Sequence, residues 1–318
     1  MTNFQNTLAP RLKSGIKKCL VLPLSAALAS LSLVAQQQPA RPKITGIAHV
    51  RVYATNLENS RAFLTKMLGL PAGGGPCAGL TQPCFPVNEH QQIELQQAPT
   101  PAPANFLAEV AFATNDVAQM RRYLLAHSIK SGPISKDASG ALHFDLRDPE
   151  GHPLSFVQLP SQPSNYRSSD AQVSSRLLHA GFVVKNPAVE DHFYRGLLGF
   201  RMYWHGGSED SSSDDWIELQ VPDGSDWIEC MLNVLPIADH DELGVVNHFA
   251  LGVINMPHTF DRLKANGLQT NEAPEIGRDG KWQFDVFDPD ATRVEFMEFK
   301  PAQDPCCNRY EAAHPDQP

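Results

Sequence analysis

Apolar and polar residues follow the same pattern twice along the chain. The segments HVRVYATNLENSRAFLTKMLGL, from His49, and HAGFVVKNPAVEDHFYRGLLGF, from His179, both begin with alternating apolar residues, typical of a half-buried strand. In each, an Asn precedes a stretch with apolar residues three or four positions apart, and a Gly closes it, as in a capped helix. At an offset of 130, five identities fall into register: His49/His179, Asn56/Asn186, Phe63/Phe193, Leu68/Leu198 and Gly69/Gly199.

A second repeated pattern follows at an offset of 139–140. EVAFATNDVAQMRRYLLAHSI from Glu109 matches HFALGVINMPHTFDRLKANGL from His248, and FDLRDPEGHPLSFVQLP from Phe144 matches FDVFDPDATRVEFMEFKP from Phe284. Both endings contain Asp-Pro, which predicts a tight turn before a last strand. Each half of the chain is therefore predicted to hold two units of strand, helix and further strands.

The length of 318 residues suits two domains, and a polar stretch rich in Ser and Pro marks the boundary between them. We predict a first domain over 45–160, a linker over 161–176, a second domain over 177–300 and a tail over 301–318. A turn-forming Asp-Gly in VPDGSDW predicts a hairpin at 221–227.

The N-terminal residues 1–35 have the pattern of an export signal, with Lys17 and Lys18 before an apolar run of 17 residues. This run is shorter than the roughly 20 apolar residues of a membrane-spanning helix. We expect cleavage after Ala35, a periplasmic or secreted protein and no stable membrane insertion after removal of the signal. The alternative is a retained N-terminal anchor.

Export would place the remaining cysteines in an oxidising compartment. Cys77 and Cys84 flank a short loop and could pair there. Cys230 lies in an apolar run and is predicted to be a buried small hydrophobic residue. The pair Cys306-Cys307 in the tail has no assigned role.

The charge of the chain excludes one class of partner. With 26 Lys and Arg against 35 Asp and Glu, the net charge is −9, and residues 1–35 contain basic residues but no acidic ones. Nucleic-acid binding depends on a basic face, so we expect no nucleic-acid partner. A small-molecule substrate is the partner that we predict.

The repeated segments from His49 and His179, together with the final DPDATRVEF, resemble the vicinal oxygen chelate superfamily. This group includes glyoxalase I, extradiol ring-cleaving dioxygenases, methylmalonyl-CoA epimerase, and fosfomycin and bleomycin resistance proteins. The resemblance covers about residues 45–300. It implies an α+β fold of two tandem domains, each with two βαβββ modules that form a cupped mixed sheet around a metal.

The resemblance also implies a metal site in the second half. It places ligands at His179, His248 and Glu295, and it offers Glu229 as a fourth ligand, an acceptor for a ligand histidine's N–H or a catalytic general base. A lone strand His is usually a core residue, but these positions agree jointly with the family pattern. Two imidazoles and a carboxylate suit Fe(II), Mn(II), Ni(II) or Zn(II) and leave positions open for two adjacent substrate oxygens.

The first half departs from this pattern. Its matching positions are His49, Glu94, Glu109 and Ser155, so that Glu replaces a histidine and Ser replaces the last carboxylate. We expect this half to lack a metal and to serve as a packing partner, although one His and two carboxylates could still bind a ligand.

The resemblance leaves the reaction open. The four-module layout favours a dioxygenase, whereas those enzymes carry a tyrosine ten positions before the last ligand, where this chain has Asp285. A glyoxalase-like lyase or isomerase and a non-enzymatic binder of antibiotic-type molecules are the alternatives. Four tryptophans of the second half could line an apolar substrate wall or belong to the core: Trp204, Trp216, Trp227 and Trp282.

Overall fold

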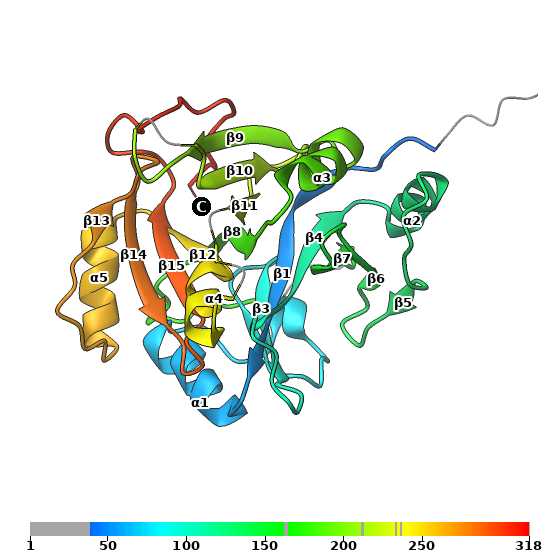
Figure 1. Cartoon of the computed structure of the whole chain (residues 1–318). Helices are drawn as coiled ribbons and strands as arrows, with labels where there is room; N and C mark the ends of the chain where they lie inside the picture. Colours follow the sequence, from blue (N-terminus) through cyan, green and yellow to red (C-terminus); the bar gives the residue numbers. More distant parts are fainter. Residues whose placement is uncertain (1–38, 162–164, 211–212, 233, 236, 318) are drawn as a thin grey trace, which may run out of the picture. The chain divides into compact units, whose positions relative to one another are not determined.

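The structure is a computed structural model that describes residues 39–161, 165–210, 213–232, 234–235 and 237–317. The predicted export signal, 1–35, lies outside the described residues. Two curled mixed sheets dominate the fold, one from each half of the chain (Figure 1). We call them the N-terminal sheet, β1–β7, and the C-terminal sheet, β8–β15.

The N-terminal sheet has seven strands in the order β2-β3-β1-β4-β7-β6-β5. Its elements are β1 (Ile44–Ala54), α1 (Leu57–Ala62), β2 (Cys84–Pro86), β3 (Gln92–Gln97), β4 (Leu107–Thr114), α2 (Val117–Ala126), β5 (Ser135–Lys136), β6 (Leu142–Arg147) and β7 (Pro153–Gln158).

The C-terminal sheet has eight strands in the order β13-β14-β15-β12-β8-β11-β10-β9. Its elements are β8 (Arg176–Val183), α3 (Pro187–Asp191), β9 (Arg201–Gly206), β10 (Trp216–Gln220), β11 (Trp227–Met231), α4 (His240–Val246), β12 (His248–Val253), α5 (Met256–Ala265), β13 (Glu275–Ile276), β14 (Trp282–Phe287) and β15 (Arg293–Glu298).

The two sheets share one pairing scheme, which confirms the predicted tandem duplication. In each, the first strand runs antiparallel to the first strand of the second module, β1 to β4 and β8 to β12. The last strand of each module then runs parallel beside its own first strand. Four central strands therefore form the floor of each cup. The fold is that of two tandem vicinal oxygen chelate domains.

The first module differs from the expected βαβββ pattern, because only two strands follow its helix. The intervening segment contains four glycines with positive φ: Gly73, Gly74, Gly75 and Gly79. This left-handed backbone conformation is incompatible with an extended strand. The predicted disulfide between Cys77 and Cys84 is present and closes this loop.

The helices begin and end where the sequence indicates. The Asn56 side chain accepts hydrogen bonds from the first turn of α1, and Gly69 follows the helix with φ +67°. The equivalent Gly199 has φ +77°. Both α1 and α3 continue directly into a π-helical turn, at 63–67 and 192–197.

Each Asp-Pro turn docks on the first helix of the other half. The Glu150 carboxylate accepts backbone hydrogen bonds from Lys185 and Asn186, which precede α3. The Asp290 carboxylate accepts from the Thr55 backbone and hydroxyl, which precede α1. The two turns are therefore equivalent contacts between the duplicated halves.

The tail packs on the C-terminal sheet, and its end lies beside β9 and β10 (Figure 1). Tyr310 of the tail completes an aromatic cage around the ammonium of Lys281, which is fully buried. Tyr203 and Trp227 form the other walls, with ring centroids 4.8 and 4.4 Å from Nζ. Cation–π contacts of this kind fix the tail against the sheet.

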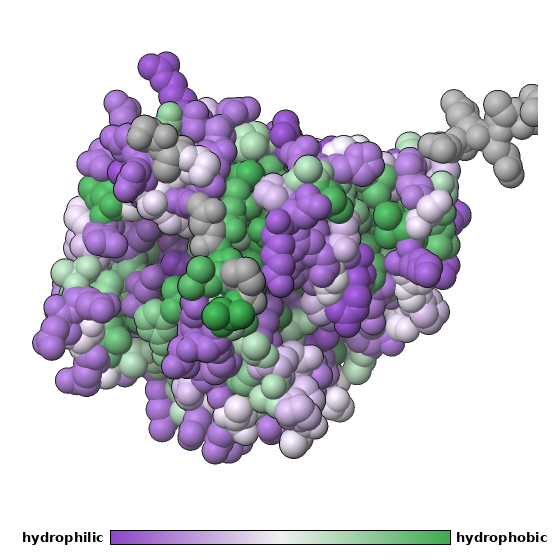
Figure 2. Space-filling model, in the orientation of Figure 1, coloured by the Kyte–Doolittle hydropathy of each residue, from purple (hydrophilic) through white to green (hydrophobic). Residues whose placement is uncertain are grey.

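Side chains from both sheets join one large apolar core, in which Cys230 is buried as predicted. Hydrophilic residues cover most of the face seen in Figure 2, and apolar residues form smaller separate patches on it. Within the described residues, no helix has the length and apolar character required to cross a membrane.

Candidate metal centre

The floor of the C-terminal sheet brings the four predicted site residues together. His179 lies on β8, Glu229 on β11, His248 on β12 and Glu295 on β15, which are the four central strands. One ligand atom of each lies within 4.8 Å of the others, and all four residues are buried. We call this set the C-terminal cup.

Strand register explains why these side chains converge. Gly181 is the cross-strand partner of both Glu229 and His248. A Cβ on Gly181 would lie 2.1 Å from the His248 ring, so the imidazole occupies space that only glycine leaves. Ala250 is likewise the partner of both His179 and Glu295. Small residues at the centre of the floor therefore make room for the donors around it.

The distances between the donor atoms fit a single cation. His179 Nε2 lies 3.0 Å from His248 Nε2 and 3.4 Å from Glu295 Oε2. His248 Nε2 lies 3.1 Å from Glu229 Oε2 and 3.3 Å from Glu295 Oε2. Metal–donor bonds of about 2.1 Å put neighbouring donors about 3.0 to 3.4 Å apart. The separation of His179 Nε2 from Glu229 Oε2 is longer, at 3.8 Å.

The protonation states also suit a cation. Burial lowers the pKa of His179, which favours the neutral imidazole that a metal requires. Burial alone would raise the pKa of Glu295, but hydrogen bonds with His179 and His248 and the charge of Arg293 outweigh it and hold the pKa well below its usual value. The pKa of His248, unlike that of His179, is raised. Burial and Arg293 lower it, but the effects of Glu229 and Glu295 outweigh them. A cation would compete with the proton on this imidazole.

A pocket of about 220 Å³ opens onto two of the carboxylates, Glu229 and Glu295. Two of the four tryptophans, Trp204 and Trp216, line it, whereas Trp227 stacks against the His179 ring with centroids 5.0 Å apart. The pocket is otherwise polar, and its further lining residues are Glu218, Glu275, Gly277, Arg278, Asp279, Gln283 and Arg293.

Glu218 is a pocket residue that the sequence analysis missed. It pairs with Glu229 across the β10–β11 hairpin, is fully buried and has no hydrogen-bond partner for either carboxylate oxygen. Burial raises its pKa well above the usual value, which favours the neutral form. The repeated tripeptide Trp-Ile-Glu, at 216–218 and 227–229, is a signal that could have identified it.

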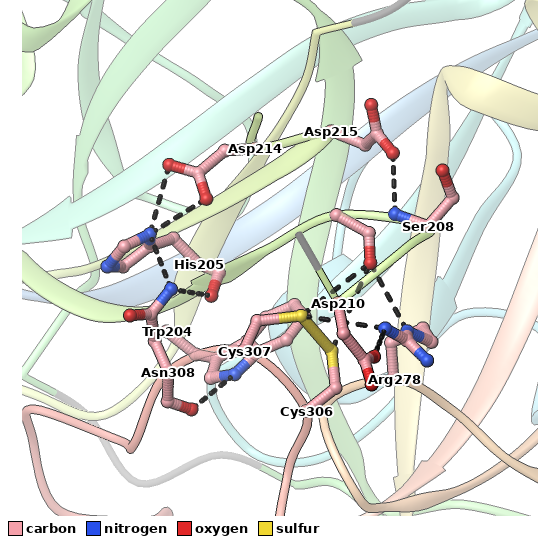
Figure 3. The surroundings of a disulfide bond; sticks show 11 residues. Trp204, His205, Ser208, Asp210, Asp214, Asp215, Arg278, Cys306, Cys307 and Asn308 are labelled. Atoms are coloured by element: carbon pink, nitrogen blue, oxygen red, sulfur yellow. Dashed lines mark hydrogen bonds and ion pairs between the residues drawn. A yellow bond between two sulfur atoms is a disulfide. The ribbon is translucent and has the colours of Figure 1, made fainter. Parts of the chain in front are cut away.

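Arginines add positive charge to the pocket. Arg293 lies two positions before Glu295 on the same strand, and its Nη2 is 2.9 Å from His248 Nε2. Arg278 contacts the Asp210 carboxylate and lies 3.6 Å from Cys307 Sγ, where Cys306 and Cys307 form a disulfide (Figure 3). The period of two along β15 could have indicated Arg293, whereas the contacts of Arg278 depend on how the tail packs.

The corresponding floor of the N-terminal sheet carries His49, Glu94, Glu109 and Ser155, which we call the N-terminal cup. Arg51 occupies the register position of Gly181 and lies between Glu94 and Glu109. Its guanidinium is 2.8 Å from Glu94 Oε2 and 2.5 Å from Glu109 Oε2. Ser155 Oγ donates to Glu109, and His49 Nε2 lies 3.2 Å from the same carboxylate. The guanidinium thus supplies positive charge directly to both carboxylates.

Comparison with known proteins identifies the fold. Solved structures of extradiol enzymes match most of the chain. They include an extradiol ring-cleaving dioxygenase from Brevibacterium fuscum, with 20% identity, a TM-score of 0.63 and coverage of 85% of this chain and 74% of that chain. The 2,3-dioxygenase LapB from Pseudomonas sp. KL28 matches with 18% identity and a TM-score of 0.62, over 84% of this chain and 97% of that chain.

A third structure, homoprotocatechuate 2,3-dioxygenase from Brevibacterium fuscum in complex with 3,4-dihydroxyphenylacetate, shows 19% identity and a TM-score of 0.62 over 86% of this chain and 84% of that chain. At these identities the likeness concerns the fold. No curated protein matches the chain in sequence. A family model does match residues 176–296, which span all four residues of the C-terminal cup. The description of that model is the Glyoxalase/Bleomycin resistance protein/Dioxygenase superfamily, so the C-terminal half of the chain is similar to this superfamily in sequence.

Proposed function

We propose that this protein is an exported metalloenzyme whose C-terminal cup binds a small substrate through two adjacent oxygens. The observation that carries the proposal is the convergence of two imidazoles and two carboxylates in one buried cluster. Two buried carboxylates beside two imidazoles are costly, and a bound cation would offset this cost in addition to the nearby Arg293. The set would hold Fe(II), Mn(II), Ni(II) or Zn(II), and such an ion supplies Lewis-acid polarisation of substrate oxygens.

The number of donors favours a lyase or isomerase. If His179, Glu229, His248 and Glu295 all bind, a six-coordinate ion keeps two positions, and a substrate that chelates through two oxygens fills both. No position then remains for dioxygen. In this arrangement the work of the chain is proton transfer, with Glu229 as the base and the neutral carboxyl of Glu218 beside it as a proton donor.

Extradiol dioxygenation is the second candidate, and one distance favours it. Glu229 Oε2 lies 3.8 Å from His179 Nε2, farther than the other donors. With Glu229 outside the ligand set, three donors remain and an additional position is open. The fold shared with ring-cleaving enzymes supports this candidate. Asp285, in place of the family tyrosine, counts against it.

The pocket restricts the substrate. A volume of about 220 Å³ admits only a small molecule, and Trp204 and Trp216 offer an apolar wall. Arg278 and Arg293 place positive charge at the same pocket, which favours an anionic substrate or one that becomes anionic on binding.

Cysteine pairing supports the export part of the proposal. Cys77 and Cys84 form a disulfide with Cα atoms 5.6 Å apart, and the tail carries a second disulfide. Disulfides of this kind persist in oxidising compartments such as the periplasm. Fractionation of cells that express the full chain tests the location, and a protein retained in the cytoplasm with 1–35 attached would overturn it.

Metal content and two assays test the rest. We expect one ion per chain at the cup, so that His248→Ala lowers the metal content by one ion per chain, together with conversion of an α-ketoaldehyde–thiol adduct or oxygen-dependent cleavage of a catechol. Glu229→Gln separates the two reactions, because it should abolish the isomerase activity and spare a three-donor dioxygenase. Ligand binding with no metal in either protein would replace the enzyme proposal with a binding function.

A further inference from the structure

A second cluster of metal-ligating side chains lies at the contact between the two halves. Asp148 and His152 belong to the turn that joins β6 to β7, and Glu190 belongs to α3. One ligand atom of each lies within 4.8 Å of the others. The cluster is separate from the C-terminal cup and lies where the Asp-Pro turn of the first half docks on the second half.

Both carboxylates of this cluster are buried, and that of Glu190 is incompletely paired. Asp148 is 5% exposed and Glu190 is 1% exposed. His152 Nδ1 lies 2.6 Å from Asp148 Oδ2, which also accepts a hydrogen bond from the Tyr194 hydroxyl at 3.2 Å. Glu190 Oε1 accepts from the Glu150 backbone N–H, but Glu190 Oε2 has no hydrogen-bond partner. A buried carboxylate oxygen without a partner is costly, and either a proton or a bound cation removes this cost; burial and Asp148 raise the pKa of Glu190 to about 7.

The duplicated turn in the second half shows that the fold does not require this cluster. Asp288 occupies the position of Asp148 and makes the same turn hydrogen bonds. The positions of His152 and Glu190 are taken by Thr292 and Ser60. The same turn thus docks on the equivalent helix with neither an imidazole nor a carboxylate at the positions that match His152 and Glu190.

We infer that Asp148, His152 and Glu190 bind a divalent transition-metal ion of the Zn(II) type. One imidazole and two carboxylates are a common donor set for such an ion, and Glu190 Oε2 lacks any other partner. The ion would join the last turn of the first half to the first helix of the second. Its role would be structural, because ions that bind only the folded state stabilise it.

This site is tested by zinc binding to the full-length His248→Ala protein, because that substitution removes a ligand of the C-terminal cup. After loading with Zn(II) and desalting, we expect one zinc ion per chain to remain in His248→Ala. A further Glu190→Gln change, which keeps the size of the side chain, should remove it. Zinc should also raise the unfolding temperature of His248→Ala and leave that of the double variant unchanged.

Glu150→Gln in the same background is the matched control. It changes an acidic residue of the same turn that is not among the three ligands, so zinc should stay bound. Retention of zinc by the double variant would overturn the inference, as would the absence of zinc from His248→Ala. If Glu190→Gln in the His248→Ala background raised the unfolding temperature, and zinc changed that temperature neither with nor without the substitution, Glu190 would hold a proton and not an ion.

Discussion

Arg51 in the N-terminal cup and Gly181 in the C-terminal cup occupy the same place in the duplicated chain. Each is the cross-strand partner of two site residues, Glu94 and Glu109 in one case and Glu229 and His248 in the other. Arg51 extends a guanidinium between its partners, whereas Gly181 leaves the space to an imidazole.

The comparison shows that the same four-strand floor can hold either carboxylates paired with an arginine or a cluster of possible metal ligands. Buried carboxylates need a positive partner, and the first cup provides it from its own chain. The second cup has no side chain at this position and exposes its donors to a shared centre. Arg51 thus neutralises the carboxylates of the first cup, whereas Gly181 leaves room for the four side chains of the second cup that could hold an ion.

The strongest way to break the comparison is to place the arginine in the second cup. Gly181→Arg would introduce a Cβ 2.1 Å from the His248 ring and a cation between the donors. We expect metal affinity to fall by about a hundredfold or more, as for other losses of ligand geometry. Metal content after dialysis against a dilute metal buffer measures it.

Gly132→Ala is the control for this substitution. Gly132 has a negative φ, and an added Cβ would come no nearer than 3.5 Å to its neighbours, so metal content should stay at the wild-type value. A Gly181→Arg protein that folds and still binds metal would show that this position does not separate the two cups.

Removing the arginine from the first cup should lower stability instead. Arg51→Ala leaves Glu94 and Glu109 buried without their cation. Loss of one partner of a buried ion pair costs about 3 to 5 kcal/mol of unfolding free energy. Urea denaturation measures this change. The half-buried Arg61, 3.7 Å from the exposed Glu58, is the control, and its change to Ala should cost less than about 1 kcal/mol.

The architecture could be predicted from the sequence, because the two halves share identical residues at a fixed offset. His49 and His179, with the Gly residues that close each helix, fixed the strand–helix order that the structure confirms. The missing strand of the first module was not predicted. Its cause is local backbone conformation: Gly73, Gly74, Gly75 and Gly79, in the segment before β2, have positive φ.

The site was predictable only in part. Family spacing identified the four donors that the structure brings together, since each lies at a repeated strand position. It did not identify Arg51 or Arg293, which lie two residues from a site position and act through cross-strand contacts. The cluster at Glu190 was also missed, because its members come from two halves that meet only after folding.

We expect the Glu109 carboxylate of the first cup to make the stability of the protein depend on pH in the acidic range. Burial alone would raise the pKa of Glu109, but His49, Arg51 and Ser155 together lower it to about 2. A folded pKa below the unfolded value of about 4.5 stabilises the protein above pH 4.5, and the effect is lost as pH falls from about 4.5 to 2.

This shift corresponds to about 3 kcal/mol of unfolding free energy. Glu109→Gln should therefore flatten the decline of stability over that pH range relative to the wild type, as urea titrations at several pH values would show. An unchanged slope would mean that Glu109 keeps its ordinary pKa and that Arg51 does not neutralise it.

Substitutions in the two Asp-Pro turns should have the smallest effect on unfolding free energy, and they form the most closely matched pair of variants. Glu150→Ala removes the acceptor of the backbone N–H groups before α3, and Asp290→Ala removes the acceptor at the equivalent place before α1. Loss of such an acceptor at a helix start costs about 1 kcal/mol of unfolding free energy. Because the turns are related by the duplication, the two changes should be equal within error and additive in the double variant. A clearly larger effect of Glu150→Ala would show that the first turn contributes more to the unfolding free energy than the second. The neighbouring cluster of Asp148, His152 and Glu190 would explain the difference.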